Sequence, residues 1–200
     1  MPQSPTVSRS DQRRALSVST VAFTACFAVW TIFSIIGIQI KQELGLSETQ
    51  FGLLVGLPIL TGSLSRIFLG IWTDQYGGRI VYVAVMVLAA AATLLLTWAD
   101  TYLTTLIAAL GVGLAGGSFA VGIAYVSRWY PTHQQGTALG IFGVGNVGAA
   151  VTKFIAPFVL VAYGWQTVAN VWAIVLLVMA AVFWFCLLYT SDAADDPTLV

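Results

Sequence analysis

Charged side chains are scarce in this sequence of 200 residues. Lys, Arg, Asp and Glu make up 8% of it, whereas hydrophobic residues make up 58%; a soluble domain carries about 25% charged residues. So few charges cannot coat a water-soluble globule of this size. The eight basic residues are balanced by eight acidic ones, which leaves no basic surface for nucleic acid. The composition therefore excludes a soluble enzyme, a nucleic-acid binder and a disordered tail.

Residue types that bind metals or perform catalysis are equally rare. The sequence has one histidine, His133, and two cysteines, Cys26 and Cys186, which lie far apart within apolar runs. Without a CxxC motif or a Cys/His cluster, we expect free thiols, no metal site and no cofactor. A membrane enzyme would also need an acid/base set, and no Asp or Glu lies within an apolar run. We therefore expect no enzymatic activity.

Six long apolar runs dominate the chain. Each is long enough to cross about 30 Å of hydrocarbon, which takes about 20 residues of helix. Because backbone groups in lipid must be satisfied internally, each run is expected to be an α-helix. The sequence predicts an all-α membrane protein, with a six-helix domain over 17–189 between an N-terminal tail (1–16) and a polar tail (190–200). The predicted spans are 17–40, 50–72, 79–98, 101–127, 137–162 and 165–189.

The basic residues are distributed unevenly between the two sides that these spans define. One side carries five of them and the other carries Lys41 alone. The positive-inside rule places the five in the cytoplasm, so both termini are expected there and the protein in the cytoplasmic (inner) membrane. The five are Arg9, Arg13, Arg14, Arg79 and Arg128.

Two glycine-rich segments, 111–116 and 143–148, match the pattern G-x-G-x-x-G. A dinucleotide site of that pattern needs a preceding strand and a βαβ unit. Both segments instead lie within apolar runs, where glycine allows helices to approach closely. We reject the dinucleotide interpretation.

The loop between the second and third runs contains a recognisable motif. Residues 70–79 read GIWTDQYGGR, which resembles the loop motif G-x-x-x-D-x-x-G-[RK]-[RK] of the major facilitator superfamily, except that Gly78 replaces a frequent basic residue. Asp74 can cap a helix or pair with a cation, and Arg128, on the same side, is its expected partner. The resemblance implies a gating role for Asp74, Arg79 and Arg128; an ordinary solvated turn is the alternative.

A second resemblance is more specific. Residues 113–119 read GLAGGSF, residues 135–148 read QGTALGIFGVGNVG and residues 61–66 read TGSLSR. The first two look like the glycine-rich signature of the nitrate/nitrite porter family within that superfamily, and the third resembles its anion-binding arginine segment. These matches cover most of residues 50–160.

This resemblance implies a transporter that moves nitrate and/or nitrite by alternating access, as a symporter or an antiporter. It also implies that Gly143 and Gly145 lie at the substrate site. Major facilitators have twelve helices in two halves, so the chain resembles an N-terminal half whose C-terminal six-helix partner is missing. A truncated fragment is expected, and a homodimer of halves is the alternative. A major facilitator for another small anion also fits.

Arg66 lies sixteen residues into the second run. A cation at such depth costs from about 3 to more than 10 kcal/mol. Because the apolar runs contain no carboxylate, the sequence predicts a buried guanidinium without an acidic partner. Its planar fork can donate two parallel hydrogen bonds to an oxyanion.

Counting the same depth along the neighbouring runs identifies three further residues. Phe27, Phe119 and Asn146 fall within about 5 Å of the level of Arg66 at about 1.5 Å per residue. The Asn146 amide can donate to an anion, and the two rings can wall a flat slot. The resemblance assigns such roles to an arginine, an asparagine and a pair of aromatics, with Phe27 a loose match. Core packing of the rings and an interhelical hydrogen bond from Asn146 are the alternatives.

Lys153 lies seven residues beyond Asn146. Two helical turns place both residues on one face, about 10 Å apart along the axis. Lys153 can attract anions towards the site or carry a proton in a coupled cycle. A lysine that snorkels to the membrane interface is the alternative.

Overall fold

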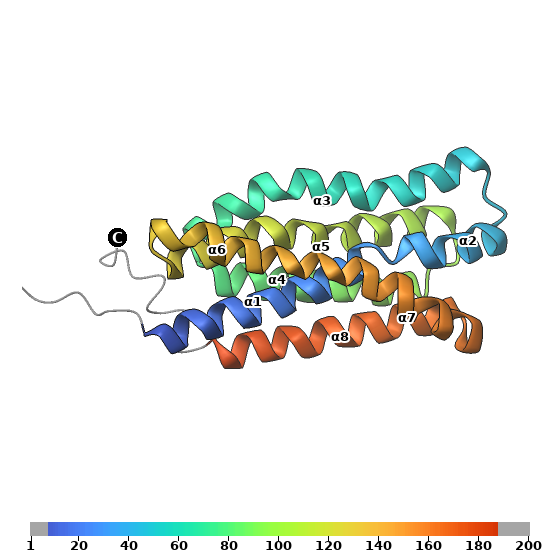
Figure 1. Cartoon of the computed structure of the whole chain (residues 1–200). Coiled ribbons are helices and arrows are strands. Elements are labelled where there is room, and N and C mark those ends of the chain that lie inside the picture. The colour runs from blue at the N-terminus through green and yellow to red at the C-terminus, as the bar shows by residue number, and fades with distance from the viewer. Residues whose placement is uncertain (1–7, 188–200) are drawn as a thin grey trace, which may run out of the picture.

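The computed structural model describes residues 8–187, and this part of the chain forms an elongated bundle of helices (Figure 1). Six spans are long and apolar enough to cross a membrane, which confirms the predicted all-α membrane fold. In chain order the elements are α1 Arg9–Trp30, α2 Phe33–Leu44, α3 Glu48–Tyr76, α4 Gly78–Leu96, α5 Tyr102–Trp129, α6 Thr132–Gly143, η1 Val144–Asn146, α7 Val147–Tyr163 and α8 Trp165–Cys186.

Polar side chains fix where several helices begin. The Ser47 side chain accepts from the Gln50 amide and the Gln50 side chain accepts from the Ser47 amide, a capping box at the start of α3, and Thr101 begins α5 in the same way. Ser8 caps α1, which starts at Arg9 rather than at the first residue of the apolar run. A hydropathy pattern locates the hydrocarbon-embedded part of a helix, whereas capping decides its end.

Two of the six spans are interrupted, although the sequence predicts one helix for each. The first breaks between α1 and α2, where the Thr31 hydroxyl donates to the Phe27 carbonyl (3.1 Å) and the Ile32 amide donates to Val29 in a tightened turn (3.0 Å). The fifth passes through the short 3-10 segment Val144–Asn146 between α6 and α7. Neither interruption contains a proline.

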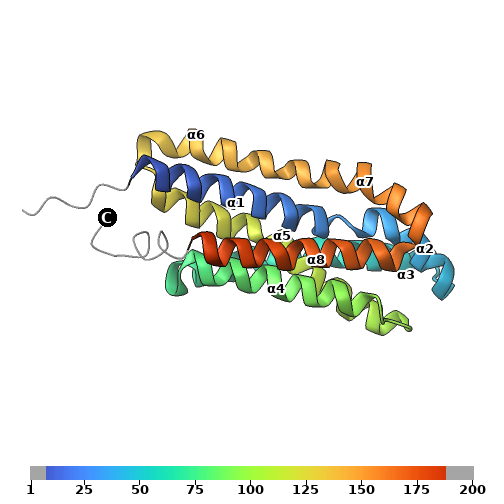
Figure 2. The same cartoon turned by 90° about the horizontal axis from the view of Figure 1, so that it is seen from below.

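Helix α5 packs along α3 and α4 and also contacts α1, while α4 packs along α8 (Figure 2). Glycines allow the close contacts. A Cβ on Gly113 of α5 would lie 2.7 Å from Cβ of Thr61 in α3, and one on Gly148 of α7 would lie 2.1 Å from the Thr24 carbonyl oxygen in α1. Gly113 and Gly148, one in each glycine-rich segment, therefore serve helix packing, as the sequence predicts.

A buried chain of hydrogen bonds ties α1, α7 and α8 together. The Thr152 hydroxyl donates to the Ala28 carbonyl (2.7 Å), and the Trp172 indole N–H donates to that hydroxyl (2.8 Å). In an apolar bundle such a chain fixes the relative height of its helices, because each displaced group would lose its partner.

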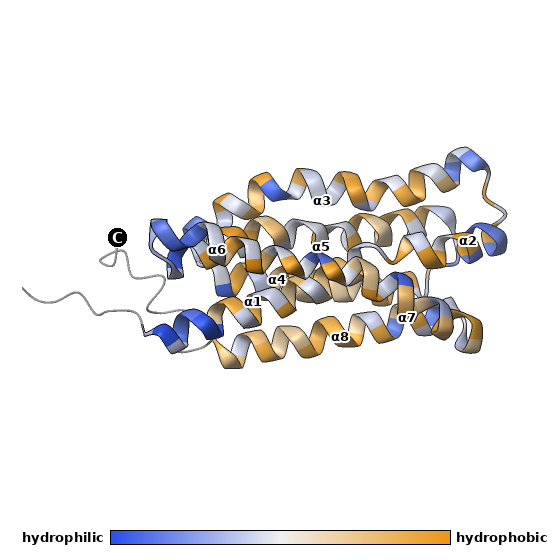
Figure 3. Cartoon of the chain, viewed as in Figure 1, coloured by the Kyte–Doolittle hydropathy of each residue, from blue (hydrophilic) through white to orange (hydrophobic). Residues whose placement is uncertain are grey.

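Hydrophilic residues gather at the two ends of the bundle and apolar residues fill its middle (Figure 3). We call the end where α1, α4 and α6 begin the basic end, because it carries Arg9, Arg13, Arg14, Arg79 and Arg128. At the opposite end Lys41 pairs with Glu48. This polarity along the bundle is typical of a multi-pass membrane protein.

Candidate functional site

Arg66 lies in α3 and folds back against α5 and α1. Its Nε donates a long hydrogen bond to the Gly116 carbonyl of α5 (3.4 Å). Its Cζ lies 5.4 Å from the centre of the Phe119 ring and 5.9 Å from that of the Trp30 ring. Both distances fall within the range of cation–π attraction, about 6 Å. One hydrogen bond and two ring contacts, from α5 and α1, thus hold the guanidinium of Arg66 against these two neighbouring helices.

The terminal nitrogens of Arg66 differ from its Nε in that they have no partner among the described residues. Within residues 8–187, neither Nη1 nor Nη2 has a hydrogen-bond or ion-pair partner, so no described carboxylate neutralises this cation. The side chain is only partly buried, whereas the sequence predicts a buried guanidinium. The position of a residue along the helix axis does not determine whether a neighbouring helix packs over it. No described helix packs over this face of α3.

Two glycines, Gly116 and Gly62, let Trp30 and the helices α3 and α5 pack closely enough for Arg66 to reach the Gly116 carbonyl. A Cβ on Gly116 would lie 2.6 Å from Cε2 of Trp30, and one on Gly62 of α3 would lie 2.8 Å from its Nε1 and 2.9 Å from the Gly113 carbonyl oxygen. Larger residues at these positions would displace Trp30 and separate α3 from α5. The Gly116 carbonyl would then move out of reach of Arg66.

Trp30 belongs to the site although sequence analysis did not identify it. Its indole N–H donates to the Pro58 carbonyl of α3 (2.9 Å), and its ring faces Arg66. Trp30 follows Phe27 by three residues on the same face of α1. Extending the depth argument by one helical turn would have found it.

Phe119 and Phe27 lie in one aromatic cluster with Trp30, Phe23 and Phe142. Phe119 contacts Arg66 directly, whereas Phe27 lies one ring away, 4.9 Å from Trp30 between ring centres. Phe23 stacks on Phe142 at 4.8 Å and packs 5.4 Å from Phe119. The predicted proximity of Phe119 to Arg66 is therefore present, and Phe27 reaches the site through Trp30.

Asn146, Gly143 and Gly145 do not contact Arg66 in the described part of the chain. The Asn146 amide donates to the Gly143 carbonyl (2.7 Å) within the 3-10 segment, and its side chain is exposed. Gly145 is buried against Phe23, whose Cδ1 would lie 2.4 Å from an added Cβ, whereas Gly143 faces open space. A substrate-binding role for these three residues stays a prediction.

Lys153 lies on α7 with its side chain exposed, and no ion pair joins it to another described residue. It lies on the side of Asn146 away from the basic end. This placement fits an anion-attracting or proton-carrying residue and also fits a lysine at the interface, so its role remains a prediction.

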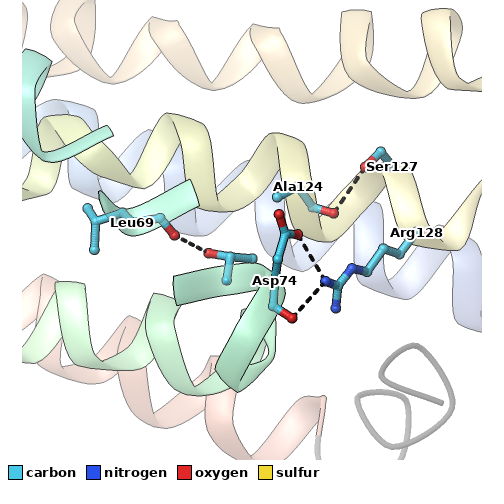
Figure 4. Close-up of polar contacts among 6 residues, drawn as sticks. Leu69, Asp74, Ala124, Ser127 and Arg128 are labelled. Carbon is cyan, nitrogen blue, oxygen red and sulfur yellow. Dashed lines mark hydrogen bonds and ion pairs between the residues drawn. The ribbon is translucent and has the colours of Figure 1, made fainter. Parts of the chain in front are cut away.

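The ion pair expected at the basic end is present. Nη2 of Arg128 lies 3.0 Å from Oδ1 of Asp74 and 3.5 Å from the Asp74 carbonyl oxygen, which joins the end of α3 to the end of α5 (Figure 4). Arg79 instead places its Cζ 4.3 Å from the ring centre of Trp184 in α8. Both contacts join helix ends, and the gating role expected of them is still a prediction.

The described residues contain no group of three or more His, Cys, Asp or Glu side chains that could hold a metal ion. Cys26 is a buried free thiol and Cys186 a partly buried one. The candidate site comprises the Arg66 guanidinium and the aromatic cluster around it.

Comparison with known proteins points in one direction. The profile of the Major Facilitator Superfamily matches residues 18–198. The chain is 43% identical to a protein of Thermus thermophilus named probable nitrate/nitrite antiporter NarK1, over 88% of this chain and 43% of the relative. It is 31% identical to the nitrite extrusion protein of Bacillus subtilis, over 84% of this chain and 43% of that protein. The chain thus spans less than half the length of these relatives.

A solved structure shares the fold. It is a bacterial homologue of the human lysosomal transporter Spinster in an inward-facing, unoccupied conformation, with a TM-score of 0.77 at 19% identity. The match covers 90% of this chain and 43% of that one.

Proposed function

The chain belongs to the major facilitator superfamily, and from this premise we propose that it is the N-terminal half of a secondary active transporter for nitrate and/or nitrite. A second six-helix half would complete the substrate site, as in other major facilitators. Two relatives named for nitrate or nitrite, at 43% and 31% identity, support the substrate class.

The open fork of Arg66 is the observation on which this proposal depends. The guanidinium is held by one carbonyl and two ring faces, and its two terminal nitrogens have no partner among residues 8–187. A planar oxyanion can accept two parallel hydrogen bonds from such a fork. Phe119 and Trp30 add flat apolar surfaces beside it, which suit a flat ligand.

Alternating access would expose Arg66 to one side of the membrane at a time. The positive-inside rule favours a cytoplasmic location for the basic end, in the inner membrane. The Asp74–Arg128 ion pair would then hold one conformation by joining α3 to α5 at the cytoplasmic face. Lys153 is proposed to serve anion attraction or proton coupling on the opposite side of the site.

Uptake of labelled nitrate into proteoliposomes tests the substrate class. We expect uptake when this chain is co-reconstituted with a C-terminal six-helix half from a relative, and competition by nitrite that exceeds competition by chloride or formate. Equal competition by chloride would contradict recognition of a planar oxyanion. Stronger competition by formate would favour the alternative substrate class, a short carboxylate.

The chain alone is the control for its proposed status as a half. We expect no uptake from it, because α3 and α7 leave large apolar side chains exposed, among them Ile67, Phe68, Phe154 and Phe158. Uptake by the chain alone would instead support a homodimer of halves.

A further inference from the structure

A pocket of about 510 Å³ opens at the basic end, where α1 and α6 begin. The residues that line this pocket do not include Arg66 or the residues that contact it, Gly116, Trp30 and Phe119. Its walls combine two guanidinium groups with neutral polar and apolar side chains. They include Arg9, Arg13, Leu16, Tyr130, Gln134 and Thr137.

The charge in this pocket comes from two arginines one helical turn apart. Arg9 and Arg13 occupy positions i and i+4 of α1, where like charges repel each other. Within residues 8–187, neither forms an ion pair with a carboxylate. An anion placed between them would relieve this repulsion. Arg13 also acts on the neighbouring wall: burial raises the pKa of Tyr130 above its usual value, and the positive charge of Arg13 opposes part of that rise.

Hydrogen bonds hold the pocket walls in place. The Tyr130 hydroxyl donates to the Gln12 carbonyl (3.0 Å), and the Gln12 side chain donates to the Trp129 carbonyl (2.8 Å). Gln135 donates to the Tyr130 carbonyl (3.1 Å). These contacts fix the first turns of α1 against the corner between α5 and α6, so the exposed Arg9 and Arg13 side chains extend from a wall of the pocket whose backbone is held in place.

The apolar wall of the pocket joins the aromatic cluster beside Arg66. Leu16 and Ala138 line the pocket and belong to the same apolar cluster as Phe23 and Phe142. Phe23 packs on Phe119, which faces Arg66. Residues 9, 13, 16, 23, 27 and 30 repeat at helical spacing along one face of α1, and Arg13 and Phe27 are separated by about 21 Å at about 1.5 Å per residue.

We propose that Arg9 and Arg13 form a second anion site, which holds the small inorganic oxyanion at the basic mouth of the route to Arg66. The identity of the ligand rests on the proposed function. In this proposal the stacked Phe23 and Phe142 rings, which share a cluster with the pocket residues Leu16 and Ala138 and pack against Phe119, must move before an anion passes from the pocket to Arg66. Because exposed charges attract weakly, this site is expected to bind in the millimolar range and to raise the local anion concentration.

Arginine side-chain NMR on the full chain tests this second site. The sequence contains six arginines, so labelling with ¹⁵N-arginine gives six Nε–H signals that single substitutions assign. The chain is placed in nanodiscs of zwitterionic lipid and titrated with sodium nitrate, with ionic strength held constant by gluconate. We expect the Arg9 and Arg13 signals to shift with one common saturation curve.

Arg14 provides the matched control, since it is exposed on the same helix but does not line the pocket. Arg9→Gln should abolish the nitrate shift of Arg13, and Arg13→Gln that of Arg9, whereas Arg14→Gln should change neither. Equal shifts at Arg14 would reveal general charge screening and overturn the proposal. Shifts that require anionic phospholipid and ignore nitrate would assign the pocket to a lipid phosphate and overturn it too.

The Arg66 signal separates this inference from the proposed function. A nitrate shift at Arg66 without one at Arg9 and Arg13 would overturn the second site and leave the transport proposal intact. Shifts at Arg9 and Arg13 without one at Arg66 would support the anion pocket; nitrate uptake by the co-reconstituted transporter would then decide the transport proposal, because a second half completes the Arg66 site. Absence of shifts at both Arg9 and Arg13 would overturn the second site.

Discussion

Gly148 marks a very close approach of the fifth span to the first, and adding one methyl group there tests how the bundle is packed. A Cβ on Gly148 would lie 2.1 Å from the Thr24 carbonyl oxygen and 2.9 Å from the Ala28 nitrogen. Both atoms belong to the backbone of α1, so neither can rotate away. Gly148→Ala must therefore push α7 off α1, and overpacking of this kind costs about 1–3 kcal/mol.

Gly140 provides the matched control in the same span. Nothing lies within 4 Å of a Cβ added there. Gly140→Ala should stabilise the chain by about 0.4–1 kcal/mol, because alanine has fewer unfolded conformations to lose and favours the helix. The two substitutions add the same methyl group and are expected to change the free energy of unfolding with opposite signs.

Equilibrium unfolding of the chain in mixed micelles measures both effects. Sodium dodecyl sulfate is the denaturant, and circular dichroism and tryptophan fluorescence follow the transition. If Gly148→Ala unfolds at the same detergent fraction as the unmodified chain, or if Gly140→Ala loses as much stability as Gly148→Ala, the proposed contact between the first and fifth spans is wrong.

Three further changes test other contacts. Thr152→Val should cost about 1–3 kcal/mol in the same titration because it leaves the Trp172 N–H unpaired, and adding Trp172→Phe should recover part of the loss; strictly additive losses would contradict the shared hydrogen bond. Asp74→Arg and Arg128→Asp should each lower nitrate uptake and the double variant should restore it, whereas no rescue would count against a gating ion pair. Lys153→Met should abolish pH-driven uptake and leave exchange intact, and unchanged pH dependence would exclude Lys153 from coupling.

The fold could be predicted from the sequence because lipid permits so few alternatives. An apolar run of about 20 residues in a bilayer is a helix, and all six runs proved to be helical. The interruptions at Thr31–Ile32 and Val144–Asn146 have no signature in hydropathy, which is what locates the spans. The second lies in the glycine-rich segment 143–148, where the low helix propensity of glycine is the signal that hydropathy leaves out.

The candidate site was predicted in part. Depth counting brought Phe119 to Arg66 because residues at one level on packed helices meet. The same reasoning places Asn146 at the depth of Arg66, but the Asn146 side-chain amide donates to the Gly143 carbonyl in its own segment. The depth of a residue does not fix which way its helix is turned about its axis. Trp30 was missed because an apolar tryptophan in a membrane span resembles an interface anchor until its hydrogen bond to Pro58 is seen.

The affinity for nitrate of the Arg66→Lys variant tests the central claim most directly. Lysine keeps the charge and loses the planar fork, so one charge-assisted hydrogen bond worth about 1.5–3 kcal/mol should disappear. In the co-reconstituted transporter, the half-saturating nitrate concentration should therefore rise by about 10-fold to 100-fold, while Arg14→Lys should leave it unchanged. A near-normal nitrate affinity in Arg66→Lys would contradict recognition of a planar anion by this guanidinium.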